Sequence, residues 1–372
     1  MEMHPLLNKE QQKLARQYEK EKRLLGLMSL GVSLVILLAF YLTGLSSRLA
    51  HLSLGDSMVW TFLIYVFVFY GLMTLFGLPL NFYIGYVHEH KWNFSNHTIK
   101  SWFWEQSKSF FVGLVILIIV LGLLLWIMAQ TPKLWWLVAA LAMALVTVIF
   151  AAIFPVIIAP VFNKYKPIKD EELTEALNAI LSRGGLKSSG FFKEDMSRQT
   201  KKENAFLAGL GKTRRVVLGD NLMENMTSSE IVSIIAHEVG HYRYKHMWKN
   251  ILIGVAQQMA LFFILNVSIK EIFPQFLTST QWNLSLFPVF VIFLGLLSGL
   301  FLGPLNNALS RRFERQADRY ALENIEDKKS FMTALSGLAD RNLSNAYPEW
   351  WMKLLFYSHP PIGERLQTAE RY

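Results

Sequence analysis

Six long runs without Asp, Glu, Lys or Arg constrain the fold of this 372-residue chain more than any other feature. They cover residues 24–47, 57–87, 109–132, 134–163, 250–269 and 272–310. Each run reaches the length of about 20 predominantly apolar residues that crosses a bilayer as an α-helix. Because lipid offers no partner to backbone amides, we predict helices throughout. The composition agrees, since 52% of the residues are hydrophobic and 17% are charged.

The basic residues outside these runs predict the orientation in the membrane. The N-terminal tail carries Lys9, Lys13, Arg16, Lys20, Lys22 and Arg23. The segments after runs two, four and six are also rich in Lys and Arg, whereas those after runs one, three and five hold little beyond Arg48, Lys133 and Lys270. By the positive-inside rule, both termini are expected in the cytoplasm. Topology then explains the formal net charge of +9, which does not indicate binding of nucleic acid.

We therefore expect a mainly α, polytopic membrane protein with about six spans. Its expected segments are a basic cytoplasmic tail (1–23), a four-span membrane region (24–163), a cytoplasmic insert (164–247), a two-span hairpin (248–310) and a cytoplasmic C-terminal region (311–372). The first span lacks a small-residue cleavage site and is expected to be retained as an anchor. The absence of cysteine excludes disulfides, thiolate metal ligands and a cysteine nucleophile.

The cytoplasmic insert contains an HExxH motif from His237 to His241. Thr227 and Glu230 form a capping-box pattern ahead of it, which predicts the start of a helix. On a helix, positions i and i+4 lie about 40° apart, so both imidazoles can reach one metal ion while Glu238 stands beside it. This arrangement is typical of zinc hydrolases. From the pentapeptide alone, the alternative interpretation is an exposed amphipathic helix end whose histidines bind no metal.

A catalytic zinc site typically needs a third protein ligand. If the helix continued, His246 would project about 140° away from His241, so we predict a surface or packing role for it. Glu314 and Asp318 are better candidates, because they share one helix face after the two-span hairpin, which returns the chain to the same side of the membrane. One carboxylate can bind metal while the other orients an imidazole. Ordinary surface ion pairs are the alternative.

Other segments invite weaker predictions. His88, Glu89 and His90 end the second run, and histidines at i and i+2 point apart on a helix, which favours an interfacial role. His359 precedes two prolines in an extended segment, where it either stabilises an oxyanion or is an exposed loop residue. Asn204 precedes a basic turn and the β-rich run 216–218, whose edge can bind a peptide through main-chain hydrogen bonds.

The chain resembles the membrane zinc metalloproteases of the Ste24 type, the CAAX prenyl proteases and their bacterial relatives. The resemblance rests on LPL at 78–80 followed by Tyr83 and Lys91, APVFNK at 159–164, NAF at 204–206, HEVGHYRYKH at 237–246, SRRFERQAD at 310–318 and YSHPPIGERL at 357–366. These motifs follow the family order from about residue 57 to the end. Six spans rather than seven, and no long acidic insert before HExxH, resemble the bacterial relatives more than the eukaryotic ones.

The resemblance implies one zinc ion per chain and a zincin-like cytoplasmic region with a small β element. It implies His237, His241 and Glu314 as ligands, Glu238 as general base, Asp318 behind the ligands or as proton donor to the leaving amine, Asn204 and Ala205 as the substrate-holding edge, and His359 with Arg365 at the oxyanion.

We accordingly expect a zinc metalloendopeptidase that cleaves peptide bonds near the cytoplasmic membrane face. Its expected partners are the bilayer and a peptide or protein substrate that is lipidated or membrane-associated. Its expected location is a bacterial inner membrane, or the endoplasmic reticulum if the host is eukaryotic. Two alternatives are a membrane-protein quality-control protease of the HtpX type and a non-catalytic scaffold or transporter. The number of spans and the YSHPP segment favour the Ste24 type over HtpX.

Overall fold

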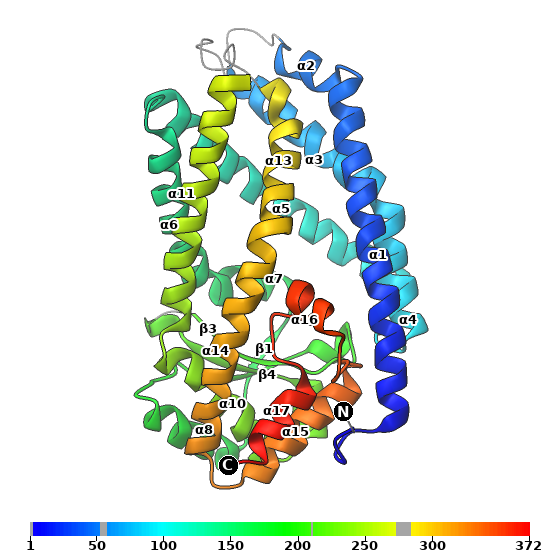
Figure 1. Ribbon diagram of the computed structural model, residues 1–372, viewed down its shortest axis with the longest axis vertical. Helices are drawn as coiled ribbons and strands as arrows, with labels where there is room; N and C mark the ends of the chain where they lie inside the picture. Colours follow the sequence, from blue (N-terminus) through cyan, green and yellow to red (C-terminus); the bar gives the residue numbers. More distant parts are fainter. Residues whose placement is uncertain (1–2, 53–57, 210, 273–283) are drawn as a thin grey trace.

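The computed structural model of the chain describes residues 3–52, 58–209, 211–272 and 284–372. Among these residues, six helical segments are long and apolar enough to cross a membrane, and a small sheet lies at one end of them (Figure 1). These segments are Lys9–Leu42, Met58–Lys91, Ile99–Gln130, Trp135–Phe162, His246–Ile272 and Leu284–Asn324. The predicted fold class is therefore confirmed. The part of the sixth predicted run within 273–283 lies outside the described residues.

The helices of the first half follow the predicted runs and extend beyond several of them. They are α1 (Lys9–Leu42), α2 (Leu45–Ala50), α3 (Met58–Phe82), α4 (Glu89–Lys91), α5 (Ile99–Gln130), α6 (Trp135–Ile153) and α7 (Ala159–Phe162). Those of the second half are α8 (Glu171–Arg183), α9 (Asp220–Asn225), α10 (Ser228–Arg243), α11 (His246–Ile272), α13 (Phe287–Leu297), α14 (Gly303–Asn324), α15 (Lys328–Arg341), α16 (Trp350–Phe356) and α17 (Ile362–Ala369). Three spans continue through π-helical turns at Tyr83–His88, Phe154–Ile158 and Ser298–Leu302.

Helix α1 begins within the predicted basic tail, because the Asn8 side chain caps it by accepting from the Glu10 and Gln11 amides. Its first turns pack on the C-terminal region. The Gln12 side chain donates to Asp340 at 3.1 Å and accepts from the Ala346 amide at 2.9 Å. The two ends of the chain lie at the same end of the molecule (Figure 1), as the even number of spans requires.

Polar groups between the spans are paired, as a lipid environment demands. The buried Trp135 indole donates to Asn266 at 2.9 Å and joins α6 to α11. Ser46 and Tyr65 share a buried hydrogen bond of 2.8 Å, and Ser46 also donates to the Ser285 carbonyl. Around them, Tyr65 stacks on Phe69 within an apolar cluster of α1, α3 and α5. These contacts hold the front spans as one bundle.

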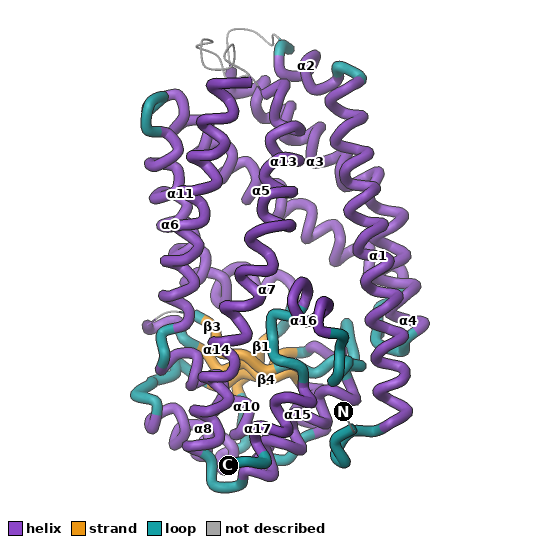
Figure 2. The backbone as a smooth tube through the Cα atoms, viewed as in Figure 1, coloured by secondary structure: helices purple, strands orange, loops and turns teal. Residues whose placement is uncertain are grey.

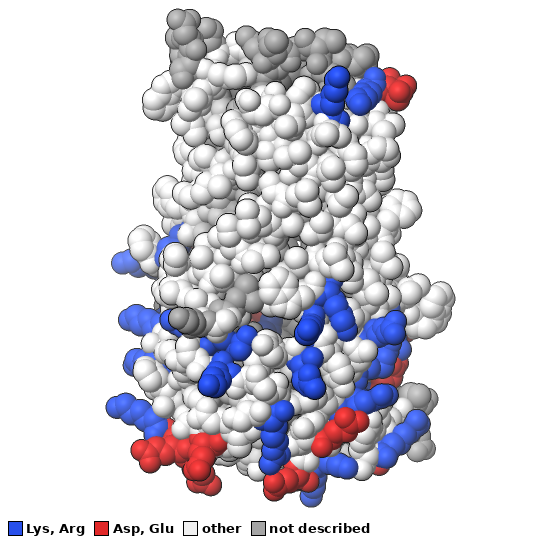
Figure 3. All heavy atoms as spheres, turned by 90° about the vertical axis from the view of Figure 1, so that its left-hand side faces the viewer, with Lys and Arg blue, Asp and Glu red and all other residues white. Residues whose placement is uncertain are grey.

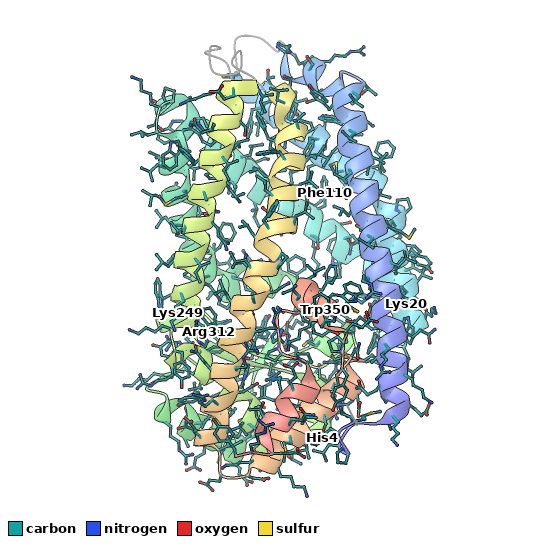
Figure 4. All side chains as sticks on the ribbon, in the orientation of Figure 1. His4, Lys20, Phe110, Lys249, Arg312 and Trp350 are labelled. Carbon is teal, nitrogen blue, oxygen red and sulfur yellow. The ribbon has the colours of Figure 1, made fainter. Side chains whose placement is uncertain are left out.

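Charge is distributed unevenly along the molecule. Lys and Arg gather in the lower part of the face shown in Figure 3, below a broad uncharged band. In Figure 4, Lys20, Lys249, Arg312 and Trp350 lie at about one level, and Phe110 lies above them. This level marks the expected boundary between the spans and the charged end.

The sheet lies at the charged end (Figure 2) and contains β1 (Tyr165–Pro167), β2 (Phe191–Glu194), β3 (Ala205–Ala208) and β4 (Arg215–Gly219). Its order is β1-β2-β4-β3, with β2 and β4 parallel and the other pairs antiparallel. Strand β3 is thus an edge strand, in which Ala205 pairs with Leu218. One apolar core joins β4 to α8 and α10 through Val216, Leu177 and Ile235. The sheet and the HExxH helix therefore form one rigid unit.

Candidate metal centre

Helix α10 carries the HExxH motif, and its predicted capping box is confirmed. The Glu230 amide donates to Thr227 Oγ1 at 3.3 Å, and Glu230 Oε2 accepts from the Thr227 amide at 2.9 Å. Ile231, Ile235 and Val239 recur every four residues and are buried in the core. This apolar stripe fixes the rotation of α10, and with it the direction in which His237 and His241 project.

A glycine allows α14 to approach α10. A Cβ atom on Gly240 would lie 2.9 Å from Ala317 Cα and 3.0 Å from the Ala317 carbonyl oxygen. Only a residue without a side chain fits at such a backbone-to-backbone contact. The close approach places Glu314, one turn before Ala317, and Asp318, the next residue after it, against the HExxH face.

Glu314 meets both histidines of the motif. Its Oε2 lies 3.2 Å from His237 Nε2, and its Oε1 lies 3.2 Å from His241 Nε2. The two Nε2 atoms are 3.1 Å apart. The potential ligand atoms of the three residues all lie within 4.8 Å of one another. Of the two carboxylates that the sequence leaves open, Glu314 faces the space between the imidazoles.

Asp318 lies behind His237 and is held there by Arg365. Its Oδ1 accepts from His237 Nδ1 at 2.9 Å, and its two oxygens accept from Arg365 Nη2 at 2.6 Å and Nε at 2.9 Å. This contact occupies Nδ1, so Nε2 is the nitrogen that faces Glu314 and that would bind a metal after losing its proton. Although burial opposes ionisation, the neighbouring carboxylates of Asp318 and Glu314 raise the pKa of His237 to about 9.

The donor set fits a divalent zinc ion. Glu314 Oε2 is buried and has no hydrogen-bond partner, although it points at an imidazole nitrogen. The carboxyl groups of Glu314, Asp318 and Glu238 also lie near the Arg365 guanidinium and outnumber it. Two histidines and one carboxylate are a common ligand set of catalytic zinc. A cation between them would satisfy the unpaired oxygen and balance the charge.

Glu238 and His359 flank the three potential ligands. Burial raises the pKa of the Glu238 carboxyl above its usual value. His359 Nε2 lies 3.4 Å from Glu314 Oε1, although 61% of the His359 side chain is exposed. The buried Pro360 and Pro361 follow it and lead into α17. His359 is thus an exposed loop residue that nevertheless reaches the centre.

The prediction that His246 projects away from His241 is wrong. It assumed one continuous helix, whereas α10 ends at Arg243 and α11 begins at His246. The chain turns between them, and His246 Nδ1 comes to lie 3.0 Å from His241 Nδ1. His246 is 2% exposed, so it is a packing residue and not a surface one. No glycine or proline in this turn signals the break.

A cavity beside the centre is lined by two residues of the centre and by Asn204, and the remaining predicted residues lie elsewhere. Asn204, His359 and Arg365 line one cavity of about 1120 Å³. Ala205, next to Asn204, is buried in β3. His88 is also buried, and its Nε2 lies 3.2 Å from Glu21 Oε2, which ties α1 to the end of the second span. Among the described residues, His88 is not part of the metal-binding group.

Comparisons with known proteins match the whole length of the chain. A family profile described as "Peptidase family M48" matches residues 167–372. A second, described as "CAAX prenyl protease N-terminal, five membrane helices", matches residues 1–164, where the described chain has four candidate spans.

Individual relatives agree with these profiles. The "Uncharacterized metalloprotease YhfN" of Bacillus subtilis is 30% identical over 82% of this chain and 72% of its own length. "CAAX prenyl protease 1" of Saccharomyces cerevisiae is 30% identical over 81% of this chain and 70% of its own. The crystal structure of S. mikatae Ste24p superposes with a TM-score of 0.88 and 26% identity, covering 99% of this chain and 91% of that one.

Proposed function

The chain belongs to peptidase family M48 and is a membrane metalloprotease, and from this premise we propose that it is a zinc endopeptidase. His237, His241 and Glu314 are the proposed ligands of one zinc ion per chain. The observation that carries this assignment is the convergence of their ligand atoms within 4.8 Å around a buried carboxylate oxygen without a hydrogen-bond partner.

A zinc ion held there would supply Lewis acidity for attack of water on the scissile carbonyl. Glu238 accepts a proton from the attacking water and delivers it to the leaving amine. Its raised pKa makes it a stronger base than an exposed glutamate. Asp318, fixed by Arg365, holds the Nδ1 proton of His237 and so keeps its Nε2 free for metal. His359 donates a hydrogen bond to the developing oxyanion.

The substrate peptide is proposed to lie along the edge strand β3. Its outer edge offers backbone groups, and an extended peptide can add there through main-chain hydrogen bonds with little sequence preference. Asn204 is exposed at the start of the strand and shares a cavity with His359. A peptide that follows β3 past Asn204 is thus directed towards the proposed oxyanion donor.

The charged end of the molecule is proposed to face the cytoplasm. Lys and Arg concentrate there, as the positive-inside rule requires of a cytoplasmic face. Cleavage would then take place at the cytoplasmic surface of a bacterial inner membrane, or of the endoplasmic reticulum in a eukaryotic host.

We further propose a membrane-associated, lipidated peptide as the substrate. This rests on relatives in Saccharomyces cerevisiae and human that are named CAAX prenyl protease 1 or its homolog. Cleavage of matched peptides with and without a farnesyl group by the purified protein tests it. Equal rates for the two peptides would remove the lipid from the proposal and leave the protease chemistry intact.

Two variants test the zinc chemistry separately from the fold. Glu238→Gln should abolish proteolysis yet retain zinc, since it removes the base and no ligand. Glu314→Ala should lose zinc and activity together. Measured turnover in Glu238→Gln would refute the base assignment, and full zinc occupancy in Glu314→Ala would refute the third ligand. Activity that withstands a chelator would point to a non-zinc mechanism.

A further inference from the structure

His246 opens α11 after a two-residue break. The amide of Tyr244 donates to the Gly240 carbonyl at 3.0 Å, and that of Lys245 donates to the Tyr242 carbonyl at 2.8 Å, which closes the end of α10. Lys245 adopts the left-handed region with φ 57°. A side chain there is strained, so surrounding contacts must hold the turn. The turn brings the His246 ring back against His241.

The His246 ring is enclosed and both of its nitrogens have partners. It stacks on Phe313, with centroids 4.4 Å apart and planes 14° apart. Its Nδ1 lies 3.0 Å from His241 Nδ1, and its Nε2 lies 2.9 Å from Gln316 Oε1. A continuous chain of hydrogen bonds therefore leads from His241 on α10, through the first residue of α11, to Gln316 on α14.

The donors and acceptors in this series of hydrogen bonds determine which nitrogen of each imidazole carries a hydrogen. Gln316 Oε1 can only accept, so His246 Nε2 carries its hydrogen. The neutral His246 ring then has a lone pair on Nδ1 and must accept from His241 Nδ1. His241 thus carries its hydrogen on Nδ1 and presents the lone pair of Nε2 towards Glu314. This is the tautomer that a metal ligand through Nε2 requires.

We propose that His246 and Gln316 are positioning residues that fix the tautomer and ring orientation of His241. The inference rests on the proposed role of His241 as a zinc ligand. Each imidazole of HExxH then has its own acceptor behind it, a carboxylate for His237 and a neutral imidazole for His241. The neutral acceptor orients His241 without adding a charge near the centre.

A packing role is the competing explanation, because His246 also fills space over Phe313. His246→Phe separates the two, since it keeps an aromatic ring on Phe313 and removes both hydrogen bonds. Gln316→Leu removes only the hydrogen bond between Gln316 and His246 Nε2. Loss of such an outer partner typically weakens metal binding by roughly 10- to 100-fold. We expect that loss for both variants, measured as the zinc dissociation constant by competition with a chelator.

Conservative variants should recover the binding. His246→Asn places an amide oxygen near the position of Nδ1, where it can accept from His241. Gln316→Glu offers only acceptors to His246 Nε2. Gln257→Leu is the matched control, because it breaks the amide pair with Asn306, at 2.7 and 3.2 Å, between the same two helices. We expect all three variants to bind zinc close to the wild-type affinity.

A second measurement reports on the ligand field directly. The visible spectrum of the Co²⁺-loaded protein should change in His246→Phe and Gln316→Leu and stay as in the wild type in Gln257→Leu. Wild-type zinc affinity in His246→Phe would reduce His246 to packing and overturn the inference. Equal losses in Gln257→Leu would do the same, by showing general destabilisation. If the wild-type protein itself bound no zinc, the proposed function would fail first.

Discussion

Gly240→Ala tests whether the contact between α10 and α14 sets the geometry of the metal centre. The added Cβ would lie 2.9 Å from Ala317 Cα and 3.0 Å from both the Ala317 carbonyl oxygen and Tyr320 Cβ. Carbon atoms in favourable contact are about 3.5 to 4.0 Å apart. Since two of the three contacts are with backbone, no side-chain rotation relieves them. The helices must therefore separate by roughly 0.5 to 1 Å.

Such a displacement is large for a metal site. Glu314 lies one turn from Ala317 on α14 and reaches both histidines at 3.2 Å, whereas ligand distances tolerate only about 0.2 Å of error. Overpacking of this kind typically costs about 1–3 kcal/mol. Alanine gains up to about 1 kcal/mol of helix propensity over glycine, so the net loss of stability should be about 0–2 kcal/mol. Metal affinity should suffer more than stability.

The assay is chelator competition for the zinc dissociation constant, together with thermal unfolding of the detergent-solubilised protein. Gly254→Ala in α11 is the matched control, because a Cβ there meets nothing within 4 Å. We expect Gly240→Ala to bind zinc at least about tenfold more weakly, and the control to bind it normally. Wild-type affinity in Gly240→Ala would show that α14 yields without moving Glu314, and the reasoning from close approach would fail.

Three further predictions concern the remaining parts of the site and the sheet. Asp318→Asn should weaken zinc binding by roughly tenfold, because it removes the carboxylate behind His237; an unchanged dissociation constant would contradict this. Zinc at 100 times its dissociation constant should stabilise the wild-type protein by about 2.7 kcal/mol but not Glu314→Ala, as thermal unfolding will show. Burial raises the pKa of the Glu194 carboxyl, so the folded chain binds the carboxyl proton more tightly than the unfolded chain does. The free energy of unfolding should therefore fall as pH rises from about 4.5 through the raised pKa. Glu194→Gln should flatten this slope, since its amide oxygen still accepts from Asn163 and Tyr165, and equal slopes in unfolding scans at several pH values would refute the argument.

The spans and the start of the HExxH helix could be predicted because they depend on local physics. A run without charges forms a helix in lipid whatever its neighbours do, and the Thr227 cap depends on residues three apart. Only part of the sheet could be predicted from the sequence. Strand β4 has a β-rich sequence, whereas β1 and β2 are three and four residues long. Their pairing depends on contacts across the sheet, not on local sequence.

The metal centre, too, could be predicted from the sequence only in part. The i and i+4 spacing of His237 and His241 fixes their common direction, but nothing local distinguishes Glu314 from Asp318 as the partner. That choice is made by the rotation of α14 at the Gly240 contact. The position of His246 was missed because Lys245 adopts a left-handed conformation that its residue type does not favour. Contacts with Phe313 and Gln316 hold the His246 ring in place, and both of these residues lie 67 or more positions after His246 in the sequence.

The division of the proposed centre across the last two spans bears on how the protein is made. His237 and His241 precede both helical segments in the sequence, and Glu314 lies near the end of the second, Leu284–Asn324. Arg365, which holds Asp318, is synthesised later still. The proposed ligand set is therefore complete only after both helical segments have been synthesised. The order of synthesis thus delays completion of the proposed metal centre.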